Sequence, residues 1–332
     1  MLENYGITVA WQGITVDGLT AIATEADKLG FGYIWVPEAW GLEAFSVISH
    51  ILCKTKSIRV GTGITNVYSR SAALIGMGCA TFDQIAPGRF MLGLGSSGKG
   101  LIENWHGNDF SKPLRRTEEY VQVIRKVAKG DPIDFDGEVL KHLSKFRLFT
   151  RPIESKLEIY LGAIGDANLK LAGKICEGAI LAEYPSTKLD HALECLKEGS
   201  QGANKKLLTY LPSFISNSGE NLLKASEQIA KNIAFYITSM GTFYPKNLVR
   251  LGYEDEVNNI VEANKQGGSK ASVQALRERI FDELSLVGRP QSILERVSKF
   301  PHGAIPVLGF GARSSEEIAG AIESMRTLSR EG

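Results

Sequence analysis

The chain has few cysteines, no long apolar run and no leader-like start. Only four of its 332 residues are cysteines, and none forms a C-x-x-C pair, which argues against a disulfide-stapled fold or a zinc ribbon. No segment approaches the roughly 18 apolar residues that a membrane-spanning helix needs. The first residues also lack a basic region followed by an apolar run. We therefore expect a cytoplasmic protein with buried, reduced thiols.

An excess of charge of either sign is also missing. The chain has 38 basic and 37 acidic residues and a formal net charge of +1, so nothing biases it toward nucleic acid or an anionic membrane. The G-x-S-x-G, H-E-x-x-H and P-loop motifs are absent, which removes support for serine hydrolases, zinc peptidases and nucleoside triphosphatases. No metal site is expected, because metal-ligand spacing is absent around His50, His142, His191 and His302.

Apolar strand-like runs alternate regularly with amphipathic stretches. The stretch 17–29 shows the helical pattern best, with apolar residues on one face and charged residues off it. Eight such strand–helix pairs predict an α/β fold, a (β/α)8 TIM barrel that forms one domain over 1–332. The strands are expected near 5–10, 33–37, 57–61, 89–93, 158–162, 178–181, 207–213 and 304–309.

Three segments do not fit this repeat. A polar loop, 104–113, follows the fourth strand, and 131–150 is expected to be an extended insertion; we expect both at the mouth of the barrel. A longer insertion, 243–284, contains the polar turn Gln266-Gly267-Gly268-Ser269 and is expected to form a small helical subdomain near the seventh barrel unit.

The segment 57–98 is the most informative, because two of the predicted strands end there in glycines and small polar residues. In parallel α/β folds, ligands bind beyond the carboxyl ends of the strands. The stretches 63–66 and 93–97 fall at those ends, and glycine allows a ligand to approach the backbone closely. The sequence therefore predicts a binding site at this edge of the barrel.

Five short motifs in the same order resemble the luciferase-like flavin and deazaflavin oxidoreductase superfamily. The resemblance is closest to the branch that uses coenzyme F420, which includes methylenetetrahydromethanopterin reductase, and it covers nearly the whole chain. Each motif alone is weak, whereas five in order are specific. The motifs are FGYIWVPE at 31–38, GTGITN at 61–66, APGR at 86–89, GLG at 93–95 and LGAIG at 161–165.

The resemblance implies a bacterial-luciferase-like barrel whose third strand ends in a bulge with a non-prolyl cis peptide at Gly63–Ile64. That bulge would support the central ring of the cofactor, and Asn66 would contact the ring edge. A turn-forming role is the alternative for Asn66. Residues near the ribityl chain would be Gly95, Ser96 and Ser97, and residues near the phosphate would be Gly162, Ala163 and Gly165. Two further cofactor-binding residues, Glu183 and Ser186, would lie near the next rim.

Two residues are candidates for the proton donor. Glu38 ends the second strand, where deazaflavin-using relatives carry an Asp-His pair; this chain has Glu38-Ala39 instead. A carboxyl group there could donate a proton if burial raised its pKa, although an ordinary rim carboxylate is the alternative. His106 lies in the loop after the fourth strand, beside Trp105, and could act on the substrate side.

These features together predict an oxidoreductase that moves a hydride between coenzyme F420 and a small organic substrate. One alternative is a luciferase-like monooxygenase that uses reduced FMN and oxygen. Another is a non-catalytic flavin-binding protein, which the altered residues at 38–39 would permit. The resemblance also implies a homodimer that pairs through early helices, and the stretch 45–52 is apolar enough to be covered.

Overall fold

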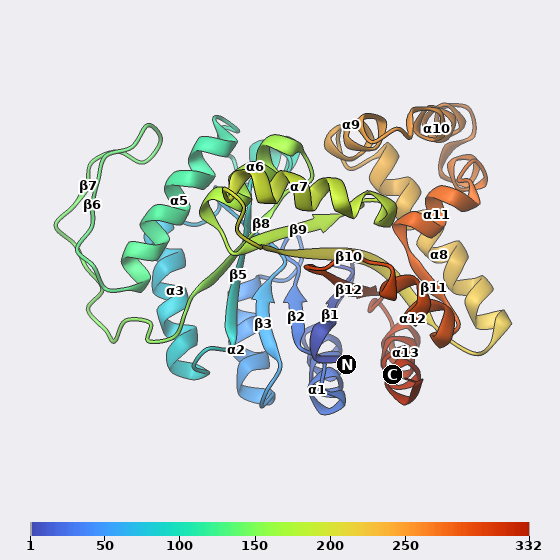
Figure 1. Ribbon diagram of the computed structural model, residues 1–332, viewed down its shortest axis with the longest axis horizontal. Coiled ribbons are helices and arrows are strands. Elements are labelled where there is room, and N and C mark those ends of the chain that lie inside the picture. The colour runs from blue at the N-terminus through green and yellow to red at the C-terminus, as the bar shows by residue number, and fades with distance from the viewer. Residues whose placement is uncertain (1, 332) are drawn as a thin grey trace.

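Eight parallel strands close into a barrel in the computed structural model, which describes residues 2–331 (Figure 1). β1 pairs with both β2 and β12, while β10 pairs with both β9 and β12, so the barrel ring has no open edge. The predicted α/β fold is confirmed. The barrel strands are β1 (Gly6–Val9), β2 (Tyr33–Val36), β3 (Arg59–Thr62), β5 (Phe90–Gly95), β8 (Glu158–Gly162), β9 (Gly178–Ala182), β10 (Lys206–Ile215) and β12 (Ala304–Phe310).

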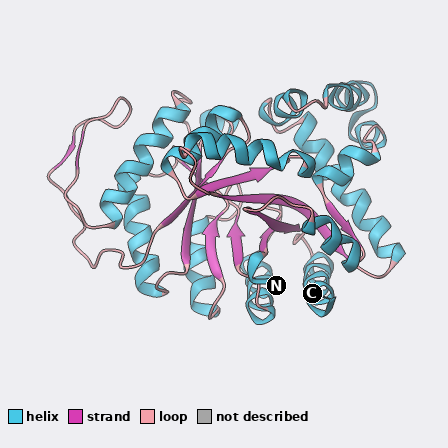
Figure 2. Cartoon of the chain, viewed as in Figure 1, coloured by secondary structure: helices cyan, strands magenta, loops and turns pink. Residues whose placement is uncertain are grey.

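Helices cover the outside of this barrel, as Figure 2 shows by colour. Local sequence sets their ends: Thr15 caps the first helix through its side chain, and Gly30 ends it in the left-handed conformation. No helix within residues 2–331 is long and apolar enough to cross a membrane. The outer helices are α1 (Val16–Leu29), α2 (Ala44–Lys54), α3 (Ala72–Ile85), α5 (Pro113–Ala128), α6 (Asp166–Ile175), α7 (Leu189–Gly199), α8 (Gly219–Thr238) and α13 (Ser315–Glu331).

The apolar side chains form two groups, one between the strands and the helices and one inside the barrel. The inner group is fully or nearly buried and fills the interior, as the packed barrel core of this fold requires. Tyr210 and Ile64 pack against it from the carboxyl end. The inner group consists of Trp35, Met91, Tyr160, Ile180, Leu208 and Val307.

The third strand is interrupted by a bulge. Gly61 pairs with Met91, and pairing resumes in β4 (Thr65–Asn66), where Thr65 pairs with Leu94. Three residues on one side therefore face two on the other, which defines a bulge. The Gly63–Ile64 peptide bond within it is cis, as predicted. β5 extends to Gly95, two residues beyond its predicted end.

The predicted insertion 131–150 does not lie at the mouth, so this expectation was wrong. It forms an antiparallel hairpin, β6 (Asp134–Phe135) with β7 (Leu143–Ser144), at the outer edge of the molecule beside α5 (Figure 1). The buried carboxylate of Glu119 on α5 accepts hydrogen bonds from the backbone N–H groups of residues 138, 139 and 140. Those bonds hold the hairpin to the outside of a barrel helix.

The insertion 243–284 is helical, as predicted. It contains α9 (Phe243–Arg250), α10 (Glu254–Gln274) and α11 (Glu278–Leu284), and its glycine turn appears as a non-helical residue, Gly268, inside α10. The predicted loop 104–113 is also present between α4 (Lys99–Asn104) and α5. The remaining elements are β11 (Leu286–Gly288), α12 (Pro290–Ser298) and the short helices η1 (Leu2–Asn4) and η2 (Ser186–Lys188).

Candidate active site

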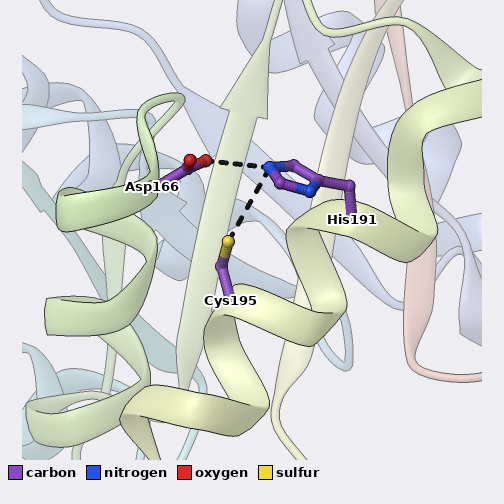
Figure 3. A group of neighbouring side chains, drawn as sticks. All are labelled: Asp166, His191 and Cys195. Carbon is purple, nitrogen blue, oxygen red and sulfur yellow. Dashed lines mark hydrogen bonds and ion pairs between the residues drawn. The ribbon is translucent and has the colours of Figure 1, made fainter.

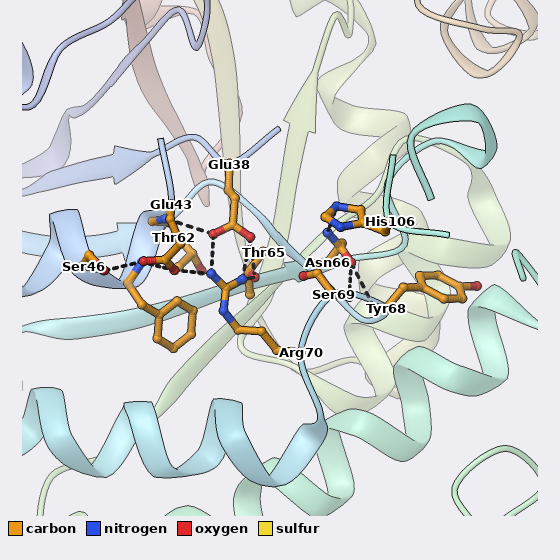
Figure 4. Close-up of polar contacts among 12 residues, drawn as sticks. Glu38, Glu43, Ser46, Thr62, Thr65, Asn66, Tyr68, Ser69, Arg70 and His106 are labelled. Atoms are coloured by element: carbon orange, nitrogen blue, oxygen red, sulfur yellow. Dashed lines mark hydrogen bonds and ion pairs between the residues drawn. The ribbon is translucent and has the colours of Figure 1, made fainter. Parts of the chain in front are cut away.

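Glu38 is held in an ion pair at the end of β2. Its Oε1 lies 2.6 Å from Nη1 of Arg70, and its Oε2 lies 2.9 Å from Nη2 (Figure 4). Oε1 also accepts from the hydroxyl of Thr65, and Oε2 from the backbone N–H of Ala44. Because both oxygens accept hydrogen bonds from a permanently charged partner, the geometry favours an ionised carboxylate that organises the loop. A proton-donor role for Glu38 stays a prediction.

Asn66 and His106 are 40 residues apart in sequence and meet at the mouth. Asn66 Nδ2 lies 3.4 Å from His106 Nε2, while its Oδ1 accepts from the backbone N–H groups of Tyr68 and Ser69 (Figure 4). The turn-forming role considered for Asn66 is therefore real, and its amide N–H faces the histidine. An amide N–H can donate only to a ring nitrogen that carries no proton, so this contact is a hydrogen bond in the tautomer that has its proton on Nδ1.

The side chain of Ile64 lies against two of the predicted glycines. A Cβ atom at Gly95 would be 3.1 Å from Ile64 Cδ1, and one at Gly162 would be 3.3 Å from Ile64 Cγ2. A Cβ at Gly63 would come within 2.8 Å of the Tyr210 hydroxyl. The bulge, β5 and β8 thus form one closely packed surface at the carboxyl end of the barrel, where larger residues would not fit.

Ser96 and Ser97 follow β5 at the same edge. Both are partly exposed, and Ser97 has a left-handed backbone with φ 59°. Within the part of the chain that the structure describes, the one hydrogen bond of the Ser96 hydroxyl is to the carbonyl oxygen of Ser97, at 3.4 Å. Their hydroxyl groups are therefore available to a ligand lying over the bulge.

The start of α6 has the features of an anion site. Gly165 is its N-cap and offers no side chain to the first-turn N–H groups, which leaves backbone donors at the positive end of the helix. The guanidinium group of Arg250, from α9, lies beside this turn and donates to the carbonyl oxygen of Ile164 at 3.1 Å. The N–H of Ala163 is engaged with Ile180 instead.

Asp166, the first residue of α6, does not oppose an anion at this position. Its carboxylate is 2.5 Å from Nη1 of Arg250 and 2.9 Å from Nε2 of His191. Burial opposes its ionisation, but the His191 hydrogen bond and the Arg250 charge lower its pKa below the ordinary value. The negative charge is thus balanced within the protein.

Cys195 joins this group, which the sequence interpretation missed. Cys195 Sγ lies 3.8 Å from the same Nε2 of His191 (Figure 3). Burial raises the pKa of the Cys195 thiol to about 11, and Arg250 Nη1 lies 3.2 Å from His191 Nε2. A cation is disfavoured beside a guanidinium group and a protonated thiol. The i, i+4 spacing of the histidine and cysteine on α7 was the only signal in the sequence.

Glu183 and Ser186 follow β9 at the rim. Glu183 is 6% exposed, has a left-handed backbone with φ 50°, and its Oε2 has no hydrogen-bond partner in the described part of the chain. Burial raises its pKa from 4.5 to about 8. Ser186 starts η2 and is partly exposed.

Aromatic rings line the mouth near Glu183. Tyr236 of α8 and Tyr244 of α9 form an edge-to-face pair with ring centroids 5.0 Å apart, and both have raised pKa values, mainly through burial and partly through the negative charge of Glu183. Trp11 lies next to the Tyr236 hydroxyl and 4.0 Å from Trp40, between ring centroids. Both tryptophans therefore belong to the aromatic group at this end of the barrel.

Comparison with known proteins agrees with the resemblance seen in the sequence. Residues 4–304 match the model of the luciferase-like monooxygenase family. The chain belongs to this family. Among the relatives of this luciferase-like protein is the 5,10-methylenetetrahydromethanopterin reductase of Archaeoglobus fulgidus, which is 27% identical over 84% of this chain and 85% of its own length.

Solved structures of low identity share the luciferase-like fold. The coenzyme F420-dependent tetrahydromethanopterin reductase from Methanopyrus kandleri matches with a TM-score of 0.79 and 20% identity, covering 98% of each chain. The oxygenating part of 3,6-diketocamphane monooxygenase from Pseudomonas putida, solved with FMN, matches with a TM-score of 0.70 and 16% identity over 100% and 98%. These two likenesses establish the barrel and do not choose between the two cofactors.

Proposed function

We propose that this protein is a coenzyme F420-dependent oxidoreductase that transfers a hydride to or from a small organic substrate. The observation that carries the proposal is the packed surface formed by Ile64, Gly95 and Gly162 at the carboxyl ends of three strands. It offers a backing for a flat ring system, and the coenzyme F420-dependent reductase from Methanopyrus kandleri shares this fold over 98% of both chains.

The residues at the barrel mouth fit the parts of this cofactor. Ile64 would back the deazaflavin ring and Asn66 would face its edge, while Ser96 and Ser97 would bind the ribityl hydroxyls. The first turn of α6 after Gly165, beside the Arg250 guanidinium group, would bind the phosphate. When bound, the deazaflavin supplies or accepts the hydride at C5.

One titration series tests the cofactor. The protein is titrated with F420, FMN and NADPH, alone and in competition, and ring absorbance and fluorescence are followed. We expect F420 to bind and FMN not to displace it. Preferential binding of FMN together with oxygen consumption would instead support the monooxygenase alternative, and F420 binding without any turnover of unsaturated acceptors would support the non-catalytic one.

A glycine variant locates the phosphate. A Cβ at Gly165 would meet nothing within 4 Å, so Gly165→Val should fold normally and weaken F420 binding at least tenfold, because its side chain would fill the phosphate position. Gly219, at the start of α8, has equally open surroundings, and Gly219→Val is the matched control with unchanged affinity.

We also propose that the protein forms a homodimer. Its interface would include α3 instead of the stretch 45–52 that the sequence analysis favoured. The apolar residues of 45–52 are mostly buried within their own chain on α2. In contrast, α3 exposes Leu74 and Met77 by 51% and 50%. Gln84 on the same helix donates to the carbonyl oxygen of Arg151, close to the 97% exposed Phe149. A second copy of the chain would cover these exposed apolar side chains.

A further inference from the structure

Glu183 differs from the other two acid–base candidates in having no partner. Glu38 accepts two short hydrogen bonds from Arg70, and Nε2 of His106 faces the amide of Asn66. Oε2 of Glu183 is buried and unpaired in the described part of the chain. An ionised carboxylate without a partner is costly to bury, whereas a neutral carboxylic acid is tolerated.

Among residues 2–331, no cation acts on the Glu183 carboxyl group to hold it ionised. The ionisable groups that interact electrostatically with Glu183 are the phenols of Tyr236 on α8 and Tyr244 on α9. Arg250, the nearest guanidinium group on α9, is bonded to Asp166 and Asn247. Burial therefore acts alone on this carboxyl group and raises its pKa to about 8.

Glu183 lies at the carboxyl end of the barrel, the end that carries the bulge. Residue 183 follows directly after β9, whose Ala182 pairs with Tyr210 of β10. The Tyr210 hydroxyl in turn lies beneath the bulge at Gly63. The acid, the bulge and the aromatic rings therefore belong to the same end of the barrel.

We propose that Glu183 is the proton donor of the reaction and that the substrate carries a carbonyl or imine group. This inference rests on the proposed function. The substrate carbon gains the hydride with its two electrons, the adjoining oxygen or nitrogen takes the proton from Oε2, and the Glu183 carboxylate regains a proton from solvent. Reduced F420 is the reductant.

The first test observes the proton directly and needs no cofactor. Infrared difference spectroscopy of the wild-type protein should show a carboxylic-acid C=O band that is present at pH 7 and disappears as the pH rises through about 8. The band should be missing in Glu183→Gln. It should persist in Glu119→Gln, the matched control, since Glu119 is equally buried but fully bonded to backbone N–H groups.

The second test follows catalysis. Glu183→Gln keeps the size and neutrality of the protonated acid, so it should fold and bind F420 within threefold of the wild type. Its kcat should fall 10²- to 10⁴-fold, in the range of general acid catalysis, and the alkaline limb near pH 8 should vanish from its pH–rate profile. Glu183→Asp should restore part of the rate.

Two results would overturn the inference: an ionised Glu183 at pH 7 in the infrared spectrum, or an unchanged kcat and pH profile in Glu183→Gln. A wild-type protein that failed to bind F420 would refute the proposed function and with it the catalytic role. The infrared band would still be seen in that case, so the two failures are distinguishable.

Discussion

Arg70 and Glu38 form a two-point ion pair that joins the loop after the third-strand bulge to the end of β2, with N–O distances of 2.6 and 2.9 Å. The two side chains are 14% and 9% exposed. Arg70 also contacts the carboxylate of Glu43 and lies 4.6 Å from the ring centroid of Phe45. This pair fixes the path of the chain that carries the proposed ring-binding residues.

Breaking the pair should destabilise the protein through either residue. We expect Arg70→Met to lower the free energy of unfolding by about 3 kcal/mol, because it leaves the mostly buried Glu38 carboxylate without its charged partner. Glu38→Gln should lower it by less, because Arg70 keeps its contact with Glu43. The double variant should lose clearly less than the two combined losses, as urea unfolding would measure. Glu220→Gln, which breaks the exposed pair with Lys224, is the control and should change stability by less than about 0.5 kcal/mol. Additive losses would show that the two side chains do not stabilise each other, and a Glu38→Gln protein that is stable but inactive would support Glu38 as a proton donor.

Asn66 should bind F420 through its amide nitrogen while its oxygen serves the turn. Asn66→Asp keeps an oxygen that can accept from the N–H groups of Tyr68 and Ser69 but loses the Nδ2 donor. We expect it to weaken F420 binding by about 1–3 kcal/mol with little loss of thermal stability. Asn66→Ala should lose both affinity and stability. Unchanged affinity of both variants, in a fluorescence titration, would remove Asn66 from the site.

The proposed dimer surface on α3 predicts a monomeric variant. Leu74→Glu combined with Met77→Glu places two charges on the exposed apolar side of this helix and should give a monomer in sedimentation velocity at micromolar concentration. Leu223 on α8 is 71% exposed, and Leu223→Glu should leave the dimer intact. A monomeric wild-type protein would contradict the prediction.

Asp27 ties α1 to the segment before β3 and gives the protein a stability that depends on pH. Burial opposes its ionisation, but hydrogen bonds from the backbone N–H groups of Lys56, Ser57 and Ile58 and from the Ser57 hydroxyl lower its pKa from 3.8 to about 2. A carboxyl group with a lowered folded-state pKa stabilises the fold above its unfolded pKa, and this contribution is lost as the pH falls from about 4 to 2.

Asp27→Asn should therefore lower the free energy of unfolding at pH 7 by about 1–3 kcal/mol. The difference from the wild type should shrink below pH 4, which chemical denaturation at several pH values would measure. A difference that stayed constant down to pH 2 would show that the charge of Asp27 is not what stabilises this junction.

The barrel could be predicted because each of its units is encoded locally. The alternation of apolar runs with amphipathic stretches defines a strand and a helix without reference to the rest of the chain, as α1 shows with its Thr15 cap and Gly30 end. Glycines at strand ends marked the correct edge of the barrel, and Gly63, Gly95 and Gly162 do meet there around Ile64. The hairpin 131–150 was misplaced, because the bonds that hold it come from Glu119, which precedes it in the chain and carries no signal of its own.

The sequence by itself therefore determined the order of elements, the barrel and the edge that carries the site, because these follow from short-range periodicity and from where strands end. Only the tertiary structure decided what the side chains do there. Arg70 reaches Glu38 across 32 residues and Arg250 reaches Asp166 across 84, while Oε2 of Glu183 is buried with no hydrogen-bond partner among residues 2–331. Such pairings and their absence depend on which surfaces the closed barrel brings together. The groups beside a carboxyl group decide whether it is ionised in an ion pair or stays protonated.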